Sequence, residues 1–397
     1  MEYISRKIRK LSDSQTMAMN QKSRDLQDKG VDVINLSVGE PDFPTPPHVK
    51  DAARKALDDN FTFYSPVGGY PDLKQAISRK FLSENGLNYG PANIMASNGA
   101  KHSLANAIMV LVDDGDEVIV PSPYWVTYVE LVKLAGGTNV IVKSKIEDDF
   151  KMSPRDLEEA ITPKTRVLLL CSPNNPTGTV YTKEELAGFA EILSRHPGIF
   201  VISDEIYEHI NFSGKHESIA SFKEIHDRVI VINGVSKAYA MTGWRLGYLA
   251  GPEWVVKACS KLQGQFTSGP SSISQKASVA ALTGGNSFPV EMMKAFLRRR
   301  DLVFELAGSI DGMKVSRPGG AFYLFPDISS YCGLSIDGTV IRDDNDFCMF
   351  LLEQAHVAAV PGTAFGAPNH IRISFATSDD RLTEAFKRMD KVLKRLK

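Results

Sequence analysis

The sequence predicts an α/β fold, in which helices cover both faces of a mostly parallel central sheet and a smaller α+β domain is attached. Short β-branched apolar runs alternate with helical stretches over the first two thirds of the chain. These runs are continuously apolar, as expected for strands that are buried on both faces. With 397 residues, the chain is also long enough for a large domain and a second, smaller one.

The N-terminal part is expected to hold one helix and two ordered loops. A helix over 12–29 ends at Gly30, and the short apolar segment 33–36 follows it. The stretch 37–47 is rich in Pro and Gly, which predicts an ordered loop or a crossing between domains. A second loop, aromatic and rich in Gly, covers 60–70.

The central part is expected to build the parallel sheet. The predicted strands are 94–97, 117–120, 140–142, 166–170, 199–203 and 229–232, and the predicted helices between them are 72–85, 104–112, 129–135 and 183–195. The carboxyl ends of parallel strands meet at one edge of a sheet, so we expect catalytic side chains to cluster there.

The C-terminal part is expected to form the smaller domain. A long connecting helix is predicted at 288–308, followed by strands at 322–325, 356–360 and 371–375 and a closing helix at 382–396. We therefore expect a large domain over 43–290, and a small domain that 291–397 forms together with an N-terminal arm, 1–42.

Composition and charge exclude several classes of partner. The net charge is -1 and the basic residues are scattered, so neither nucleic acid nor an anionic membrane is expected to bind. No stretch is long and apolar enough to span a bilayer, and no signal peptide is evident. The four cysteines lack metal-ligand spacing, so we interpret them as reduced packing residues and expect no metal site. A cytoplasmic protein that acts on small molecules is the expectation.

Lys237 is the candidate nucleophile. It follows the apolar run 230–232, where a buried strand gives way to a Gly-rich turn. A lysine amine reacts with an aldehyde only when unprotonated, and burial near another cation such as Arg245 lowers its pKa toward that state. From this stretch alone, an exposed loop lysine is an equally good interpretation.

Other strand ends carry side chains that complete a site. Trp125 follows one strand and could stack on an aromatic cofactor. Asn175 lies in a turn after another strand, and Asp204 ends a third, where a buried acid needs a cationic partner. The turn around Gly99, between a strand and a helix N-terminus, is typical of an anion site. A lysine, an acid and a phosphate anchor are what pyridoxal phosphate chemistry requires.

With these motifs the chain resembles the class I, fold-type I pyridoxal-phosphate aminotransferases, in particular the bacterial aspartate aminotransferase subgroup. The resemblance covers nearly the whole chain. It rests on motifs at 39–43, 99–101, 123–125, 174–178, 203–207, 236–239, 243–245 and 371–374, and on Tyr64. So many motifs in register favour this fold over any other.

The resemblance implies the roles of the residues around the cofactor, pyridoxal 5′-phosphate. Lys237 would bind the cofactor covalently and then move the proton between the substrate α-carbon and the cofactor. Asp204 would keep the pyridine nitrogen protonated. Tyr207 and Asn175 would donate hydrogen bonds to the phenolic oxygen, and Trp125 would stack on the ring.

The resemblance also implies how phosphate and substrate are bound. The phosphate would be held by Ser236, Arg245 and the backbone of Gly99, Ala100 and Lys101, with Tyr64 reaching it from a second subunit, which makes a homodimer necessary. The substrate α-carboxylate would pair with Arg372, assisted by Asn175, Trp125 and the Gly39 backbone. Because Arg372 and Lys237 belong to different domains, substrate binding should close the domains.

The implied reaction is exchange of an amino group between L-aspartate and 2-oxoglutarate, which gives oxaloacetate and L-glutamate by a ping-pong mechanism. Lys101 resembles the lysine that binds the side-chain carboxylate of dicarboxylic substrates; a solvated lysine is the alternative interpretation. Ser12 stands where members that accept prephenate carry a lysine, which puts that activity in doubt.

Other activities stay open at this point. Aromatic, alanine or prephenate specificity is an alternative within the same family, and lyases use the same fold. A non-enzymatic regulator built on an aminotransferase-like domain is disfavoured, because we expect no room for a DNA-binding domain before Val38.

Overall fold

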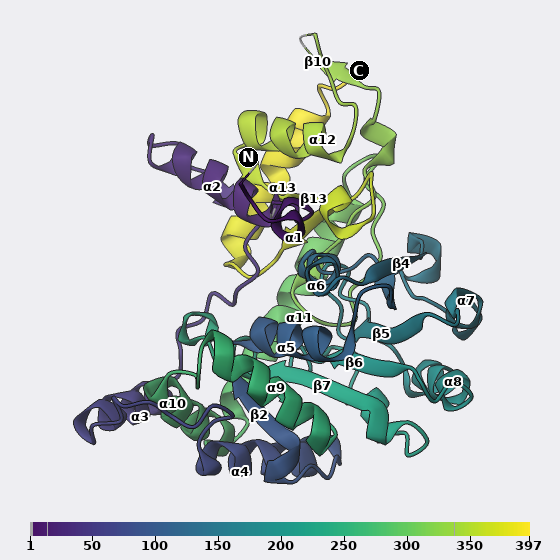
Figure 1. Cartoon of the computed structure of the whole chain (residues 1–397). Helices are drawn as coiled ribbons and strands as arrows, with labels where there is room; N and C mark the ends of the chain where they lie inside the picture. Colours follow the sequence, from purple (N-terminus) through teal and green to yellow (C-terminus); the bar gives the residue numbers. More distant parts are fainter. Residues whose placement is uncertain (1–2, 14, 337) are drawn as a thin grey trace.

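The computed structural model describes residues 3–13, 15–336 and 338–397. A seven-stranded sheet, in the order β2-β8-β7-β6-β5-β3-β4, forms the centre of the larger part of the molecule (Figure 1). Its strands are β2 (Ile94–Ser97), β3 (Glu117–Ser122), β4 (Thr138–Lys143), β5 (Thr165–Cys171), β6 (Phe200–Asp204), β7 (Val229–Gly234) and β8 (Gly247–Ala250). The pairings from β7 to β4 are parallel, which confirms the predicted sheet, and β8 runs antiparallel to both its neighbours.

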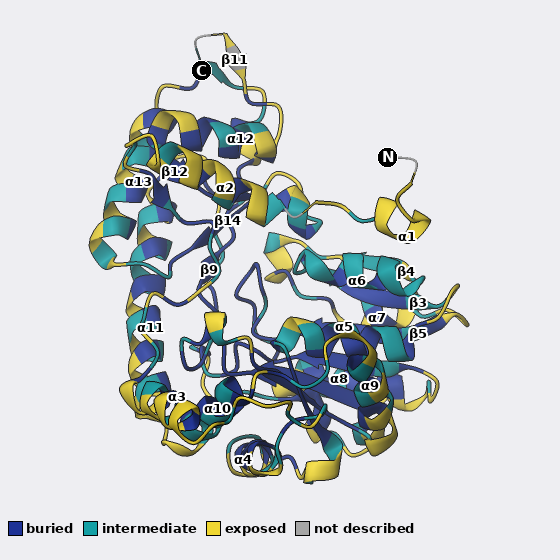
Figure 2. Cartoon of the chain, turned by 60° about the vertical axis from the view of Figure 1, so that its left-hand side comes forward, coloured by how far each residue is buried: buried dark blue, intermediate teal, exposed yellow. Residues whose placement is uncertain are grey.

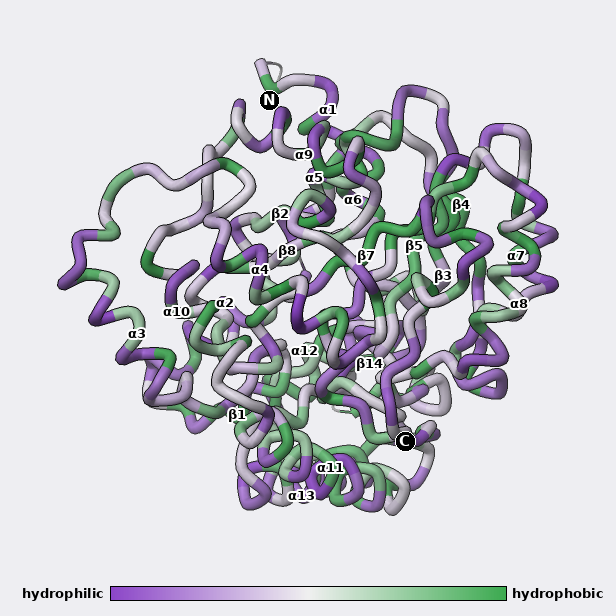
Figure 3. Tube along the Cα trace, turned by 90° about the horizontal axis from the view of Figure 1, so that it is seen from below, coloured by the Kyte–Doolittle hydropathy of each residue, from purple (hydrophilic) through white to green (hydrophobic). Residues whose placement is uncertain are grey.

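Helices cover both faces of this sheet. Alternate residues of each strand, such as Val167 and Leu168 of β5, belong to two separate apolar cores. One face packs against α5 (Ala100–Leu111), α6 (Thr127–Ala135) and α9 (Glu253–Phe266), and the other against α3 (Pro47–Asp58), α4 (Pro71–Lys80), α7 (Pro154–Ala160), α8 (Lys183–Ser194) and α10 (Ser272–Thr283). In Figure 3 the strands β5 and β7 carry hydrophobic colours, whereas outlying helices such as α3 are largely hydrophilic.

The smaller part contains a three-stranded antiparallel sheet, β13-β14-β9, packed against helices. Its elements are α2 (Gln15–Gln27), β1 (Ile34–Asn35), β9 (Tyr323–Leu324), α12 (Asp344–Phe350), β12 (Val357–Ala358), β13 (Val360–Pro361), β14 (Ile371–Ser374) and α13 (Asp379–Leu393). The long helix α11 (Ser287–Gly308) connects the two parts (Figure 2). The short helix α1 (Arg6–Arg9) and the hairpin of β10 (Ser335–Ile336) and β11 (Thr339–Val340) complete the described elements.

Several element boundaries differ from the predictions for identifiable reasons. The helix expected over 72–85 is α helical only to Lys80 and continues as a π-helix, Phe81–Asn85. The strand expected over 356–360 is two short strands, which pair with β1 and with β14. The closing helix begins earlier than 382, because the Ser378 side chain caps its N-terminus.

No helix in the described part of the chain has both the length and the apolar composition needed to cross a bilayer. The four cysteines are free, and Cys171, Cys259 and Cys348 are buried, in agreement with the interpretation as reduced packing residues.

Candidate active site

A cavity of about 410 Å³ lies at the carboxyl ends of the central strands, where the two parts of the molecule meet. It brings together most of the residues that the sequence indicated. The cavity is lined by Gly39, Ala100, Lys101, Trp125, Asn175, Asp204, Tyr207, Ser236, Lys237, Arg245 and Arg372. They come from at least six separate segments of the chain, so the fold gathers them at the edge where parallel strands end.

Lys237 lies just beyond the end of β7, and its ammonium group points into the cavity. Its Nζ donates a hydrogen bond to the Gly39 carbonyl over 2.6 Å. Burial lowers the pKa of Lys237 to about 8, and the positive charges of Arg372 and Arg245 act in the same direction, against Glu40. About a tenth of the amine is therefore unprotonated at pH 7, far more than for an ordinary lysine, and able to act as a nucleophile.

Asp204 is the last residue of β6 and is 5% exposed. Its Oδ2 accepts a hydrogen bond from the Tyr128 hydroxyl over 2.7 Å, and its Oδ1 accepts one from the Ile206 N–H over 3.3 Å. Burial raises the pKa of Asp204 to about 6, and the charge of Glu205 adds to the rise. A cationic group bound in the cavity would stabilise the Asp204 carboxylate.

Arg372, on β14, provides a buried guanidinium on the opposite side. It is 2% exposed, and its Nη1 and Nη2 donate to Asn175 Oδ1 over 3.1 Å and to the Ser37 carbonyl over 2.6 Å. The guanidinium carbon lies 4.6 Å from the centre of the Tyr323 ring. Its buried Nε has no hydrogen-bond partner among the described residues, so the group retains capacity for an anionic ligand.

Two tyrosines connect the two parts of the molecule at the floor of the cavity. The hydroxyls of Tyr207 and Tyr323 are 2.8 Å apart and hydrogen-bonded, and burial raises the pKa of Tyr207 well above its ordinary value. Both are neutral donors at physiological pH. A side chain at Gly39 would collide with the Tyr323 hydroxyl, which explains the glycine at this position.

The N-terminus of α5 forms an anion-binding corner. Gly99, its N-cap, has φ +85°, and a Cβ there would collide with the Arg245 guanidinium. Arg245 Nη1 donates to the Thr242 carbonyl over 2.9 Å, and the buried Ser236 lines the same corner. Free backbone N–H groups, a hydroxyl and a guanidinium together suit a phosphate or carboxylate.

Trp125 and Lys101 form one side of the cavity. The indole packs edge-on against Tyr128, with ring centres 5.5 Å apart. Lys101 Nζ lies 4.8 Å from the indole ring centre, and burial together with Arg245 lowers the pKa of Lys101. Lys101 therefore faces the cavity as a second cation, beside the anion-binding corner.

Tyr64 is the predicted site residue that the structure places elsewhere. It is 97% exposed and lines a separate surface hollow with Phe63 and Pro270. Within this chain it is not part of the cavity that holds Lys237.

The sequence did not indicate Tyr128 and Tyr323, two tyrosines that take part in the hydrogen bonds of the site. Tyr128 stands three residues after Trp125 at the start of α6, and this helical spacing was the available signal. Tyr323 lies within the predicted strand 322–325, where nothing in the pattern distinguishes it from a core aromatic. Thr16, Met17 and Glu40 also line the cavity without having been predicted.

Comparison with known proteins agrees with this geometry. A curated relative, the bifunctional aspartate aminotransferase and glutamate/aspartate-prephenate aminotransferase of Petunia hybrida, is 47% identical over 99% of this chain and 83% of its own. The aspartate aminotransferase of Geobacillus stearothermophilus is 44% identical over 98% of both chains.

Solved structures give the same result. The aspartate aminotransferase of Rhizobium meliloti is similar with a TM-score of 0.96 and 43% identity over 99% of both chains. That of Thermus thermophilus with maleate has a TM-score of 0.93 and 42% identity, over 99% of this chain and 100% of its own. The family model of class I and II aminotransferases matches residues 31–389. The chain therefore belongs to the class I and II aminotransferase family, and it is a transferase of fold type I.

Proposed function

We propose that the protein is a pyridoxal-phosphate-dependent aminotransferase that exchanges an amino group between L-aspartate and 2-oxoglutarate, giving oxaloacetate and L-glutamate. The observation that carries the proposal is one cavity in which Lys237, a buried amine with a pKa of about 8, faces the buried acid Asp204 and the guanidinium of Arg372. The first product, an oxo acid, would leave before the second substrate binds, so we expect ping-pong kinetics.

The residues of the cavity fit pyridoxal phosphate. Asp204, with its pKa raised to about 6, needs a cation, and the protonated pyridine nitrogen is one. The anion-binding corner of Gly99, Ser236 and Arg245 suits the phosphate. Trp125 offers a flat face for the ring. When bound, the cofactor supplies an electrophilic aldehyde carbon and a ring that accepts electrons from the substrate α-carbon.

Each protein group then has a defined task. Lys237 binds the cofactor, and as a free amine it removes and returns the proton at the substrate α-carbon. Asp204 keeps a negative charge against the pyridine nitrogen. Tyr207 and Asn175 would donate hydrogen bonds to the phenolic oxygen of the bound cofactor. Arg372, pre-oriented by the Ser37 carbonyl and Asn175, pairs with the substrate α-carboxylate.

The position of Lys101 favours a dicarboxylic substrate. Its ammonium lies beside Trp125 at the cavity and could pair with a second carboxylate. The relatives' names support aspartate, and one solved relative was obtained with maleate, a dicarboxylate. Prephenate is a second candidate substrate because the relative from Cereibacter sphaeroides is named for it, at 46% identity. Ser12, whose N–H donates to Glu130 over 3.0 Å, stands where a lysine would favour prephenate.

The proposal includes the domain organisation and the assembly. We assign 43–290 to the large domain and 1–42 with 291–397 to the small domain, and we expect substrate binding at Arg372 to draw them together over Lys237. A homodimer would bring the exposed Tyr64 of one subunit to the phosphate site of the other. The four free cysteines support a reducing compartment, the cytoplasm.

The experiment is a spectral titration of the purified protein loaded with pyridoxal phosphate. Aspartate and glutamate should each convert its absorbance to that of the amino form, and oxaloacetate or 2-oxoglutarate should restore the original spectrum. Conversion by alanine or phenylalanine alone would refute the dicarboxylic assignment. Lys237→Ala should lower turnover by more than about 1,000-fold, because it removes both the covalent anchor and the base; unchanged turnover would contradict the mechanism.

A further inference from the structure

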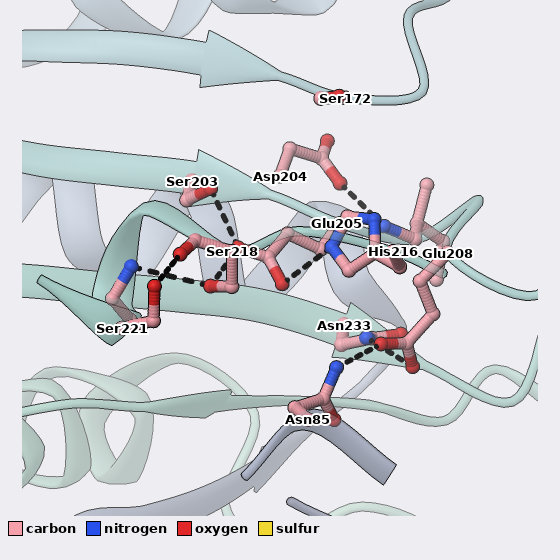
Figure 4. Close-up of polar contacts among 12 residues, drawn as sticks. Asn85, Ser172, Ser203, Asp204, Glu205, Glu208, His216, Ser218, Ser221 and Asn233 are labelled. Atoms are coloured by element: carbon pink, nitrogen blue, oxygen red, sulfur yellow. Dashed lines mark hydrogen bonds and ion pairs between the residues drawn. The ribbon is translucent and has the colours of Figure 1, made fainter. Parts of the chain in front are cut away.

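A cluster of buried charges lies beside the active site, around the ends of β6 and β7 (Figure 4). Its first member is Glu205, which directly follows Asp204 and is 1% exposed. Its Oε1 accepts hydrogen bonds from the hydroxyls of Ser203 over 2.8 Å and Ser218 over 2.6 Å. Its Oε2 is 2.9 Å from Nε2 of His216. Successive residues of a strand point to opposite faces, so Asp204 enters the cavity while Glu205 enters this cluster.

The second member of the cluster is Glu208, one turn further along. It accepts hydrogen bonds from Lys80, from Asn85 over 2.7 Å and from Asn233 over 2.8 Å. Asn233 in turn accepts the N–H of Gly234 over 2.7 Å, at the end of the strand that leads to Lys237. Glu205 therefore lies at the end of β6, which carries Asp204, and Glu208 is hydrogen-bonded to the end of β7, which leads to Lys237.

Each buried carboxylate in the cluster has a basic partner. Lys80, whose side chain is fully buried, pairs with Glu208, and His216, whose side chain is 7% exposed, pairs with Glu205. A buried carboxylate without a cation is costly even when hydroxyls donate to it. Among the described residues, Glu205 at Nε2 is the one hydrogen-bond partner of the His216 ring, and it favours the protonated ring against the cost of a buried Nδ1 that has no partner.

We propose that His216 is a positioning residue for the transamination reaction: as an imidazolium bonded to Glu205, it balances the carboxylate next to Asp204 and so keeps Asp204 ionised in the site. The inference deepens the proposed function, and rests on it for the role of Asp204. His216 touches neither substrate nor cofactor and acts through Glu205.

The charges around His216 support this assignment. Burial opposes protonation of His216, but the charge and hydrogen bond of Glu205, with the charge of Glu208, outweigh burial and the charge of Lys80, and raise its pKa. Glu205 in turn raises the pKa of Asp204. With His216 neutral or absent, the uncompensated Glu205 charge would raise the pKa of Asp204 further, and a larger fraction of Asp204 would be protonated at neutral pH.

The structure offers a matched control in the same cluster. His209 also pairs with a glutamate, its Nε2 lying 2.9 Å from Glu84, and its side chain is 18% exposed. Its Nδ1 also lies 3.5 Å from Glu208 Oε1, but it makes no ion pair with Glu205. His209→Gln therefore removes a neighbouring pair of the cluster while the partner of Glu205 stays in place.

The first test measures the imidazole of His216 directly, in the full-length protein without cofactor. The chain has eight histidines, and the resonance lost in His216→Gln identifies the one to follow by NMR. It should titrate above 6.5, the ordinary value, and in Glu205→Gln it should fall below that value, because burial then dominates. Titration of His216 at or below 6.5 in the unaltered protein would overturn the proposal.

The second test measures Asp204. In infrared spectra of the same protein, the band of a protonated carboxyl that disappears in Asp204→Asn reports its titration. His216→Gln should move the midpoint upward by about one pH unit, whereas His209→Gln should leave it in place. Equal midpoints in the two variants would refute the role of His216. Ser218→Ala removes one hydrogen-bond donor from Glu205 but no charge, so it should move the Asp204 midpoint upward by a smaller amount. This variant replaces His216→Gln in the test if His216→Gln does not fold.

The loaded enzyme provides the functional readout. His216→Gln should lower kcat about 10-fold at pH 7 and move the acid limb of the kcat profile upward, with KM for the amino acid within about twofold. A matching loss in His209→Gln would indicate structural damage and contradict the proposal. If no variant and not even the unaltered protein transaminates aspartate, the proposed function fails, while the NMR and infrared titrations still decide the role of His216.

Discussion

Lys237 and Asp204 have pKa values that burial has moved toward neutrality from opposite directions, to about 8 and about 6. In both cases burial disfavours the charged form. For Lys237 the result is a reactive amine. For Asp204 the result is a carboxylate that is costly to keep charged and is stabilised when a cation binds beside it, so the same desolvation favours a reactive amine and a cationic ligand group.

The cost of the buried acid can be measured by Asp204→Asn in the protein without cofactor. The pKa of Asp204 is about 6 in the folded chain and 3.8 in its ordinary state. The folded state therefore binds this proton more tightly, and stability is lost as the pH rises from 3.8 through 6. Above that window the carboxylate costs up to ~3 kcal/mol. The variant should be as stable as the unaltered protein near pH 4 and more stable by up to that amount at pH 7.

Urea unfolding at a series of pH values measures this difference. Asp227→Asn, at a side chain that is 84% exposed, serves as the control and should not change the pH dependence. With cofactor, Asp204→Asn should lower turnover by at least about 100-fold. If Asp204→Asn were less stable than the unaltered protein at pH 7, the result would contradict the prediction that the buried carboxylate lowers the free energy of unfolding.

Substitutions of Arg372 and of Lys101 should change KM for different sets of amino-acid substrates. Arg372→Lys replaces a fixed, two-sided donor by a point charge, and should raise KM for every amino acid by about 100-fold. Lys101→Gln should raise KM for aspartate and glutamate by about 10-fold and leave alanine unaffected, because alanine has no second carboxylate. Steady-state kinetics with aspartate, glutamate and alanine distinguish the role of Arg372 from that of Lys101. Equal effects of Lys101→Gln on aspartate and alanine would remove Lys101 from substrate recognition.

The limits of prediction at this scale follow from side-chain geometry. Lys237 and Asp204 could be located because a charge next to a buried strand is unusual and needs an explanation, whereas Arg372 was indicated only by the resemblance to the aminotransferases. Tyr128 and Tyr323 could not, since a tyrosine in an apolar element is ordinary for a core. Their roles depend on where the hydroxyl points, to Asp204 and to Tyr207, and the sequence pattern does not contain that information.

Among the elements, the strand-turn-helix unit from β2 to α5 should be the most sensitive to a small change. At Gly99 a side chain would face both a left-handed backbone and the Arg245 guanidinium. Gly99→Ala should therefore weaken binding of pyridoxal phosphate by about 10- to 100-fold, by moving Arg245 or the helix N-terminus.

Gly115→Ala is the matched control for this change. Gly115 has a similar backbone angle, φ +94°, but a Cβ there would meet no atom within 4 Å. Both variants carry the backbone strain, about 1 kcal/mol, and only Gly99→Ala adds the collision. Fluorescence titration with the cofactor measures affinity, and equal losses in the two variants would show that strain alone, and not the anion-binding corner, is responsible.

The elements that could be predicted are those whose burial leaves a clear hydrophobic pattern in the sequence. The continuously apolar strands β5, β6 and β7 were found within two residues of their bounds, because both of their faces are covered. The split of 356–360 into β12 and β13 could not be foreseen, because it depends on pairing with β1 and β14, which lie far away in the sequence. The π-helical turn after Lys80 likewise left no sign in the hydrophobic pattern.

At the scale of the whole molecule, the cavity lies where the apolar core of the smaller part meets the two cores of the larger part. One core joins the N-terminal segment near Val33 to the C-terminal helices, and Tyr207 of the large part packs into it. The other two lie on either face of the central sheet. Arg372 belongs to the smaller part and Lys237 to the larger part, so the closure proposed above would change the distance between these two side chains.

The remaining prediction concerns a second copy of the chain. Tyr64 is 97% exposed, and Phe63 beside it is 79% exposed, which is unusual for two neighbouring aromatic residues. If Tyr64 completes the phosphate site of a partner subunit, then Tyr64→Ala and Lys237→Ala damage the same site from different chains. A hybrid dimer of the two variants then contains one site with both defects and one with neither.

Mixing the two variants, unfolding and refolding them together should thus restore activity. Random pairing makes half of the dimers hybrids, and one of the two sites in each hybrid is intact, so the mixture should regain roughly a quarter of the unaltered activity. Refolding each variant alone is the control, and the Lys237→Ala control should stay inactive. A mixture with no more than the mean of the two controls would mean that Tyr64 serves its own subunit or none. Restoration can arise only if one active site is built from two chains, so this result would test both the dimer and the placement of Tyr64.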